Sequence, residues 1–295
     1  MNPALQQLGY GPRDRVVIIH ADDIGMCQAT LSVLADLLDG GLVSSAAVMV
    51  PCPWFPQVAA FCRDHPTVDM GVHLTVNAEW AAYRWGPLST RDPASGLLDA
   101  AGYFHADPPT TWQQADPQAV ATELRAQVTQ ALRAGIDVTH VDTHMGTVIR
   151  PPLLPAYLAV AREHRLPLFF LGDAARLRAA GLPPELVAEG EQCGRELVAA
   201  GIPVFDALAA LPLDDPTDHV TVAKRIIDGL PPGLSVLLLH PAQDTPELRA
   251  LAPDWPSRVA NAAAGRSLEL RAYVRQAGVQ VIGYRPLREL LRAHS

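Results

Sequence analysis

The sequence predicts an α/β fold, a single-domain (β/α) barrel with parallel strands that is either complete or distorted and incomplete. Short apolar runs alternate with longer amphipathic stretches from one end of the chain to the other. The chain has 295 residues, 49% of them hydrophobic, and α/β barrels of this length commonly form one domain around one core. No repeat or low-complexity linker divides residues 1–295. An open doubly wound sheet has the same local pattern, so periodicity leaves both architectures open.

Eight short apolar runs are predicted to be buried strands. They are rich in Val, Ile and Leu, as expected for parallel strands that are covered on both faces. In chain order these runs are residues 16–20, 46–50, 70–76, 138–142, 166–171, 204–205, 235–239 and 279–282. About seven or eight such units in one domain indicate a closed or nearly closed barrel.

Five longer stretches between these runs have the apolar spacing of amphipathic helices. They are residues 29–38, 117–134, 153–164, 219–230 and 267–277. Glycine commonly ends a helix because it adopts the left-handed conformation without strain, and several of these stretches close with Gly40, Gly135, Gly229 or Gly278. The alternation of strand and helix predicts parallel βα units.

Residues 77–112 interrupt this alternation and are predicted to be a long aromatic-rich loop. Among Gly, Pro and charged residues, the segment holds Trp80, Tyr83, Trp85, Tyr103, Phe104 and Trp112. A stretch of this length without regular structure is usually functional in a compact domain. Its aromatic rings could form a platform that stacks on a sugar face, or a cluster packed beneath the loop, and the sequence leaves both readings open.

Charge and composition exclude several function classes. The net charge of −8 argues against a nucleic-acid partner, because binding a phosphate backbone normally needs a clustered basic face. No apolar run approaches the ~18 residues of a membrane span, and the first residues lack a signal-peptide pattern, so we expect a cytoplasmic protein without membrane contact. No C-x-x-C pair occurs, and free thiols are expected at Cys27, Cys52, Cys62 and Cys193.

Four predicted strands end in polar groups that a purely structural strand end does not need. These groups are Asp22, Asp23, His73, His140, Asp142, His144 and His240. The carboxyl ends of parallel strands meet at one edge, so we expect Asp23, His73 and His144 to converge as one carboxylate and two imidazoles. Three protein ligands with open positions are typical of a catalytic divalent-metal site.

The adjacent carboxylates Asp22 and Asp23 have two interpretations. A bound cation would offset their repulsion, with Asp23 as a ligand and Asp22 as a general base beside the metal. Alternatively, both could cap the helix expected to begin near Gln28 by accepting its free backbone N–H groups.

The motif H-V-D-T-H holds more polar groups than one metal needs. In an extended strand, His140, Asp142 and His144 lie on one side, so not all three need to contact the metal. We expect Asp142 or His140 to orient a neighbouring side chain instead. Other histidines, among them His105 and His219, occur in polar or helical contexts and are expected at the surface.

Four motifs resemble those of the YdjC-like carbohydrate deacetylases, a family that includes chitooligosaccharide deacetylases. In family order they are H-A-D-D-I-G, G-V-H-L-T-V, T-H-V-D-T-H and a late H-P. The resemblance implies a (β/α) barrel that removes N-acetyl groups from acetylated amino sugars or oligosaccharides and releases acetate. It implies a divalent metal ion held by Asp23, His73 and His144, with Asp22 as base and His240 as acid. The more distantly similar NodB-type polysaccharide deacetylases divide an Asp pair and two histidines in the same way.

The resemblance leaves the ion and the oligomeric state open. Two imidazoles and one carboxylate suit Zn²⁺ better than Mg²⁺, which prefers oxygen ligands, while the family leaves Mg²⁺ possible. The family also favours a homodimer, although no residue here demonstrates one.

The sequence departs from the family pattern after His144. Many members continue the motif as H-x-D-x-H-x-H, whereas here Met145, Gly146 and Thr147 follow. Glycine thus replaces a substrate-facing imidazole, and chitooligosaccharide specificity is not expected to carry over. Two alternatives are a metal-dependent hydrolase of a non-sugar amide bond and a non-catalytic sugar-binding or regulatory protein on the same fold.

Overall fold

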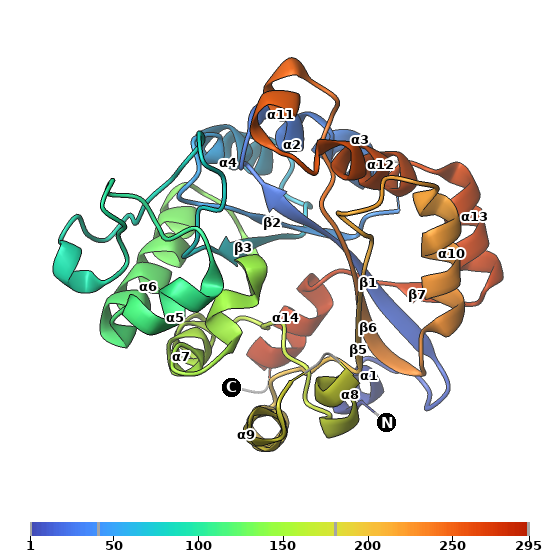
Figure 1. Ribbon diagram of the computed structural model, residues 1–295. Coiled ribbons are helices and arrows are strands. Elements are labelled where there is room, and N and C mark those ends of the chain that lie inside the picture. Colours follow the sequence, from blue (N-terminus) through green and yellow to red (C-terminus); the bar gives the residue numbers. More distant parts are fainter. Residues whose placement is uncertain (1, 40–41, 180–181, 294–295) are drawn as a thin grey trace.

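The computed structural model describes residues 2–39, 42–179 and 182–293 (Figure 1). Within these ranges, one sheet of seven strands runs in the order β4-β3-β2-β1-β6-β5, with β7 paired to β1, and every pairing is parallel. The strands are β1 (Arg15–Ile24), β2 (Ser45–Val48), β3 (Met70–Leu74), β4 (Val138–Thr143), β5 (Ala207–Ala210), β6 (Gly233–Leu239) and β7 (Gln280–Val281). The predicted α/β fold with parallel strands is confirmed.

The edge strands β4 and β5 are linked through residues 166–171. Leu168 forms an isolated parallel bridge with Val141 of β4, and Leu171 forms another with Phe205, just before β5. The sheet therefore curves toward closure without a complete hydrogen-bond ladder, which is consistent with a distorted (β/α) barrel.

Two predicted strands, residues 166–171 and 204–205, are wrong as regular strands. Both runs are apolar, but Pro167 lies within the first and Pro203 precedes the second. Proline has no N–H to donate to a ladder, so backbone pairing in these segments is limited to single bridges.

Strand β1 is longer than the predicted 16–20 and includes both Asp22 and Asp23. Adjacent residues of a regular strand point to opposite faces. Here Asp23 has a φ of 63°, and the register with β2 shifts near the end of β1. This irregularity allows both carboxylates to reach His73, at 3.6 Å for Asp22 and 3.3 Å for Asp23.

Helices surround the sheet, with α10, α12 and α13 on one side and α5, α6 and α7 on another (Figure 1). The helices are α1 (Pro3–Gln7), α2 (Gln28–Ser32), α3 (Leu34–Asp39), α4 (Phe55–Asp64), α5 (Pro108–Gln114), α6 (Pro117–Arg133), α7 (Leu154–His164), α8 (Ala174–Ala179), α9 (Pro184–Ala199), α10 (His219–Gly229), α11 (Pro246–Leu251), α12 (Trp255–Gly265), α13 (Leu268–Gln276) and α14 (Arg285–Ala293). Two short 3₁₀ helices are η1 (Pro93–Ser95) and η2 (His144–Ile149). None of the helices in the described part of the chain combines the length and apolar character that a membrane crossing requires.

Four predicted helices are confirmed within one residue at each end, as α6, α7, α10 and α13. The fifth, residues 29–38, is divided into α2 and α3. Gly135 and Gly278 follow α6 and α13 with left-handed φ values of 87° and 68°. Gly229 is the last residue of α10, and Gly40 lies outside the described residues.

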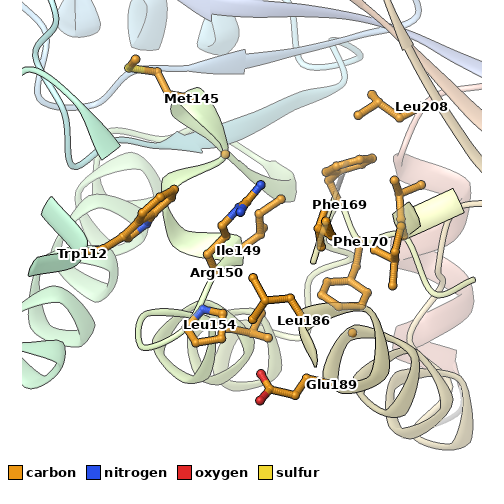
Figure 2. A pocket seen from close by; sticks show the side chains of 16 residues that line it. Trp112, Met145, Ile149, Arg150, Leu154, Phe169, Phe170, Leu186, Glu189 and Leu208 are labelled. Carbon is orange, nitrogen blue, oxygen red and sulfur yellow. The ribbon is translucent and has the colours of Figure 1, made fainter. Parts of the chain in front are cut away.

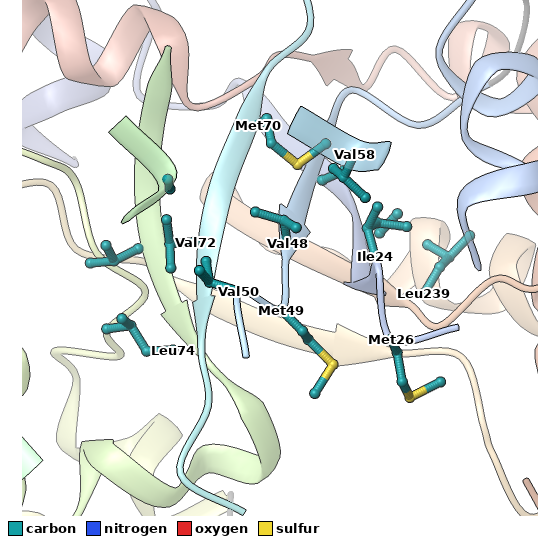
Figure 3. Packing of buried hydrophobic residues seen from close by; sticks show 14 of the residues in the cluster. Ile24, Met26, Val48, Met49, Val50, Val58, Met70, Val72, Leu74 and Leu239 are labelled. Atoms are coloured by element: carbon teal, nitrogen blue, oxygen red, sulfur yellow. The ribbon is translucent and has the colours of Figure 1, made fainter. Parts of the chain in front are cut away.

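The main hydrophobic core packs the sheet against its helices (Figure 3). Ile24, Val48 and Met70 from three neighbouring strands meet Val58 of α4, and all four are fully buried. Burying each such side chain stabilises the fold by roughly 1.5–3 kcal/mol. This core fixes β1, β2 and β3 relative to one another. The four cysteines are free and buried, as predicted.

The aromatic-rich loop, residues 77–112, is joined to this core. Its regular structure consists of η1 and the start of α5. Trp80, Trp85 and Phe104 are buried in the main core, and Trp85 Nε1 donates to the carbonyl oxygen of Asn77 at 2.7 Å. These three rings therefore form a cluster beneath the loop and offer no open face to a sugar.

Candidate functional site

Asp23, His73 and His144 meet at the carboxyl ends of β1, β3 and β4. Asp23 Oδ1 lies 3.3 Å from His73 Nε2 and 3.2 Å from His144 Nδ1, and all three residues are buried. Ligand atoms around a tetrahedral ion with bonds near 2.1 Å are about 3.4 Å apart, which matches this spacing. Asp23 Oδ1 accepts no well-aligned hydrogen bond from any described residue. A buried carboxylate oxygen in this state, facing two imidazole nitrogens, fits a divalent cation.

Each imidazole of this cluster is oriented by a carboxylate on its far side. His73 Nδ1 lies 2.7 Å from Asp142 Oδ1, and His144 Nε2 lies 3.0 Å from Glu79 Oε2. A proton on each of these outer nitrogens leaves the inner nitrogen free to coordinate an ion. Sequence reasoning gave Asp142 this orienting role as one of two options, but it missed Glu79, which lies in the loop outside every motif.

The carboxylates make this buried site strongly attractive to cations. Burial lowers the pKa of His144, but Glu79 and Asp23 outweigh it and raise the pKa to about 9. Burial has the same effect on His73, and Asp142 and Asp22 raise its pKa well above the usual value. Without a metal ion, both imidazoles are therefore protonated on both nitrogens. A bound cation would displace the proton on the inner nitrogen of each ring.

Arg258 of α12 forms an ion pair with the second oxygen of Asp23. Its Nη1 lies 2.7 Å from Asp23 Oδ2, its Nε lies 2.9 Å from Asp254 Oδ1, and its guanidinium lies over the Trp80 ring at 5.6 Å. Burial raises the pKa of Asp23, but Arg258 with the two histidines holds it well below the usual range. Asp23 is therefore ionised, with Oδ1 alone turned toward the imidazoles.

Asp22 and His240 lie together beside this cluster. Asp22 Oδ2 is 3.6 Å from His240 Nε2, and Asp22 Oδ1 is 3.1 Å from His20 Nε2. The backbone N–H of His240 donates to Asn261 Oδ1 at 2.8 Å, which fixes the chain at the end of β6. Burial lowers the pKa of His240, so this imidazole is neutral at neutral pH.

His20 connects Asp22 to Asp142. His20 Nε2 lies 2.8 Å from Asp142 Oδ2, and its Nδ1 lies 2.7 Å from Ser45 Oγ. Burial lowers the pKa of His20, but Asp142 and Asp22 raise it to about 9. A protonated His20 thus holds two carboxylates in place. Sequence reasoning missed this role, although His20 begins the H-A-D-D motif.

The family of the chain follows from a family model, described as YdjC-like protein, that matches residues 16–283. The chain belongs to the YdjC-like family. A carbohydrate deacetylase of Thermus thermophilus is 35% identical to it over 288 residues, covering 97% of this chain and 98% of the relative. A carbohydrate deacetylase of Brevibacillus brevis is 30% identical over 152 residues, covering 52% of this chain and 58% of the relative.

A solved structure shares the fold of this YdjC-like protein. It is the crystal structure of a putative cellobiose-phosphate cleavage protein from Enterococcus faecalis, with a TM-score of 0.77. The superposition covers 92% of this chain and 98% of the other, at 22% sequence identity. At 22% identity, this similarity shows a shared fold and nothing about activity.

The capping interpretation of the aspartate pair is wrong for this YdjC-like protein. The residue that precedes α2 is Cys27, whose side chain does not cap the helix, and the backbone N–H of Gln28 donates to Glu247 Oε2 at 3.2 Å. Asp22 and Asp23 instead face histidines, as the metal-site interpretation predicts.

His140 does not reach the candidate metal ligands. Its ring stacks on Tyr284 at 3.7 Å, and its Nδ1 lies 2.9 Å from Thr139 Oγ1. The expectation that His105 and His219 lie at the surface is also wrong, since both are buried and hydrogen-bonded to backbone oxygens. Buried histidines with local partners therefore resemble candidate ligands in the sequence.

The departure at Gly146 changes the chain directly after His144. Met145 and Gly146 both have left-handed backbones, with φ of 55° and 67°. A Cβ added to Gly146 would meet only Ile149 Cδ1, at 3.9 Å. The space where many family members carry an imidazole is thus open in this YdjC-like protein.

Proposed function

We propose that this YdjC-like protein is a metal-dependent hydrolase that removes an N-acetyl group from an acetylated amino sugar or oligosaccharide and releases acetate. The observation that carries the proposal is the buried cluster of Asp23, His73 and His144, with Asp22 and His240 beside it. The relative named carbohydrate deacetylase, which matches 97% of the chain, supports a carbohydrate substrate.

Asp23, His73 and His144 would hold the ion. When bound, a divalent cation would supply Lewis-acid stabilisation of the negative charge that develops on the amide carbonyl oxygen. Two imidazoles and one carboxylate favour Zn²⁺ over Mg²⁺ for this set. Elemental analysis of protein purified without added metal identifies the ion.

Asp22 and His240 would carry the protons of the reaction. Asp22 would take a proton from the attacking water as the new C–O bond forms. The C–N bond then breaks, and the departing amine needs a proton. Because His240 is neutral in the free protein, it would pass on the proton that Asp22 has gained, and their separation of 3.6 Å allows this once substrate binding tightens the site. Acetate and a free amino sugar result.

Acetate release from N-acetylglucosamine and its oligosaccharides tests the proposal. We expect release that a chelator stops and that Zn²⁺, Co²⁺ or Mg²⁺ restores. Release from simple amides but from no sugar would instead favour the hydrolase of a non-sugar amide. Metal-loaded protein that acts on neither would favour a binding protein on this fold.

Replacing Asp142 by asparagine is expected to weaken metal binding by about 10- to 100-fold. Asparagine keeps the shape but withdraws the negative charge from His73 Nδ1, which lies 2.7 Å from Asp142 Oδ1. Competition with a chromophoric chelator measures the dissociation constant. Asp64→Asn, at an exposed carboxylate ending α4, is the matched control. Equal affinity in Asp142→Asn and wild-type protein would contradict this role for Asp142.

A further inference from the structure

We propose that the substrate of this site carries an apolar group and that an apolar pocket beside η2 binds it. This inference rests on the proposed function, because it names the class of amide-bearing sugar that the site accepts. The occupant is an uncharged hydrocarbon or aromatic group attached to the sugar, either as a longer N-acyl chain or as the group at the glycosidic position.

The pocket has a volume of about 260 Å³ and lies among η2, α7, residues 169–171, α8 and α9. Figure 2 shows Trp112 and Leu154 on one side and Phe169 and Phe170 facing them. An apolar cavity of about 150 Å³ can hold benzene. The pocket is therefore large enough for an aromatic ring together with several methylene groups.

The pocket includes the residues that directly follow one candidate metal ligand. Met145 and Gly146, which follow His144 in the chain, both line it. Trp112 Nε1 donates to the carbonyl oxygen of Thr147 at 2.8 Å, which attaches one wall to the same 3₁₀ helix. A group bound in this pocket would thus lie next to a substrate held at His144.

The walls favour an apolar occupant over more sugar. Of the described lining residues, only Arg150 and Glu189 carry charge, and the Arg150 guanidinium lies over the Trp112 ring at 5.4 Å. Sugar hydroxyls buried against the remaining walls would lose their hydrogen bonds to water, which costs free energy. An apolar group leaves water without that penalty.

Two large apolar side chains remain exposed at the pocket. Met145 is 46% exposed and Leu208 of β5 is 40% exposed, and both line it. A bound apolar group would cover side chains that water otherwise contacts. Gly146 contributes open space at the same wall, because a Cβ there would meet only Ile149 Cδ1. The chain therefore has room and apolar surface directly after His144.

The test compares kcat/KM for acyl release within two pairs of substrates. In one pair, N-hexanoylglucosamine is compared with N-acetylglucosamine. In the other, the hexyl glycoside of N-acetylglucosamine is compared with its methyl glycoside. Each methylene that enters the pocket is expected to raise kcat/KM about fourfold. We expect a preference of at least tenfold for the longer member of one pair, and that pair identifies where the apolar group is attached.

Two variants assign this preference to the pocket. Leu186→Glu places a charge in the wall formed by α9 and is expected to reduce the preference to less than threefold. Leu132→Glu, at a 42% exposed position of α6 outside the pocket, should leave the preference intact. Thermal unfolding and metal content verify that both variants fold. If Leu186→Glu fails to fold, the two substrate pairs measured on wild-type protein still test whether the site prefers an apolar group.

The outcomes separate this inference from the proposed function. Metal-dependent release with no preference in either pair would overturn the pocket assignment and leave the deacetylase proposal standing. If metal-loaded protein released no acyl group from any of the four substrates, both the pocket inference and the proposed function would be overturned. A dimer that Leu186→Glu converts to monomers, with the preference unchanged, would assign the pocket to a second copy of the chain and overturn the inference.

Discussion

Replacing Asp22 by asparagine is expected to lower kcat by about 10²- to 10⁴-fold while the protein keeps its metal. Asparagine has nearly the same size but cannot accept a proton from the attacking water. Asp22 is buried beside His240 and lies outside the Asp23, His73 and His144 cluster, so coordination should persist. The measurements are kcat for acetate release and metal content by elemental analysis.

Asp64→Asn serves as the control for Asp22→Asn, because it removes an exposed carboxylate that belongs to none of the candidate metal-binding groups. It should keep both rate and metal. An Asp22→Asn rate within a few-fold of wild type would remove Asp22 from the role of base. Loss of the metal would instead make Asp22 a ligand, in the alternative grouping with His73 and Asp142 that the structure also allows.

Replacing His73 by alanine is expected to abolish metal retention and, with it, activity. Only Asp23 and His144 of the cluster would remain, and removing a ligand should cost more than the roughly 10- to 100-fold typical of an orienting residue. A metal that binds the folded state stabilises it by about 2.7 kcal/mol at 100 times its Kd. Thermal unfolding with and without added Zn²⁺ should therefore show an increase in Tm for wild type and none for His73→Ala.

His65→Ala is the matched histidine control for this experiment. His65 follows α4, stacks on Phe61 and contacts none of the cluster. Its Tm should respond to Zn²⁺ as the wild-type Tm does. If His73→Ala bound Zn²⁺ with wild-type affinity, the metal site would have to be the grouping of His20, His140 and Asp142, which does not contain His73.

The parts of the fold that the sequence predicts are those governed by continuous apolar patterns. The strands before residue 166 and four of the five expected helices follow from such patterns. Helix α9 was missed because Gly190 and Gly194 interrupt it, and glycine is a poor helix former. The structure explains them by close packing, since a Cβ on Gly194 would lie 2.5 Å from Gly172 Cα.

The candidate site is predictable where its residues end strands. Asp22, Asp23, His73, His144 and His240 could be grouped because parallel strands bring their carboxyl ends together. Glu79 and Arg258 could not be found in this way, since one lies in an irregular loop and the other on a helix, and only tertiary packing brings them to the site. The single-domain organisation, the homodimer and the cytoplasmic location stay predictions.

The contact between Arg258 and Asp23 joins residues that are 235 positions apart in the chain. Asp23 is synthesised early, whereas α12, which supplies the guanidinium, is among the last helices to be made. A nascent chain that ends before α12 therefore lacks the group that fixes one oxygen of Asp23 and leaves the other toward the imidazoles. Complete assembly of the candidate ion site thus depends on late synthesis, because the group that orients Asp23 belongs to one of the last helices of the chain.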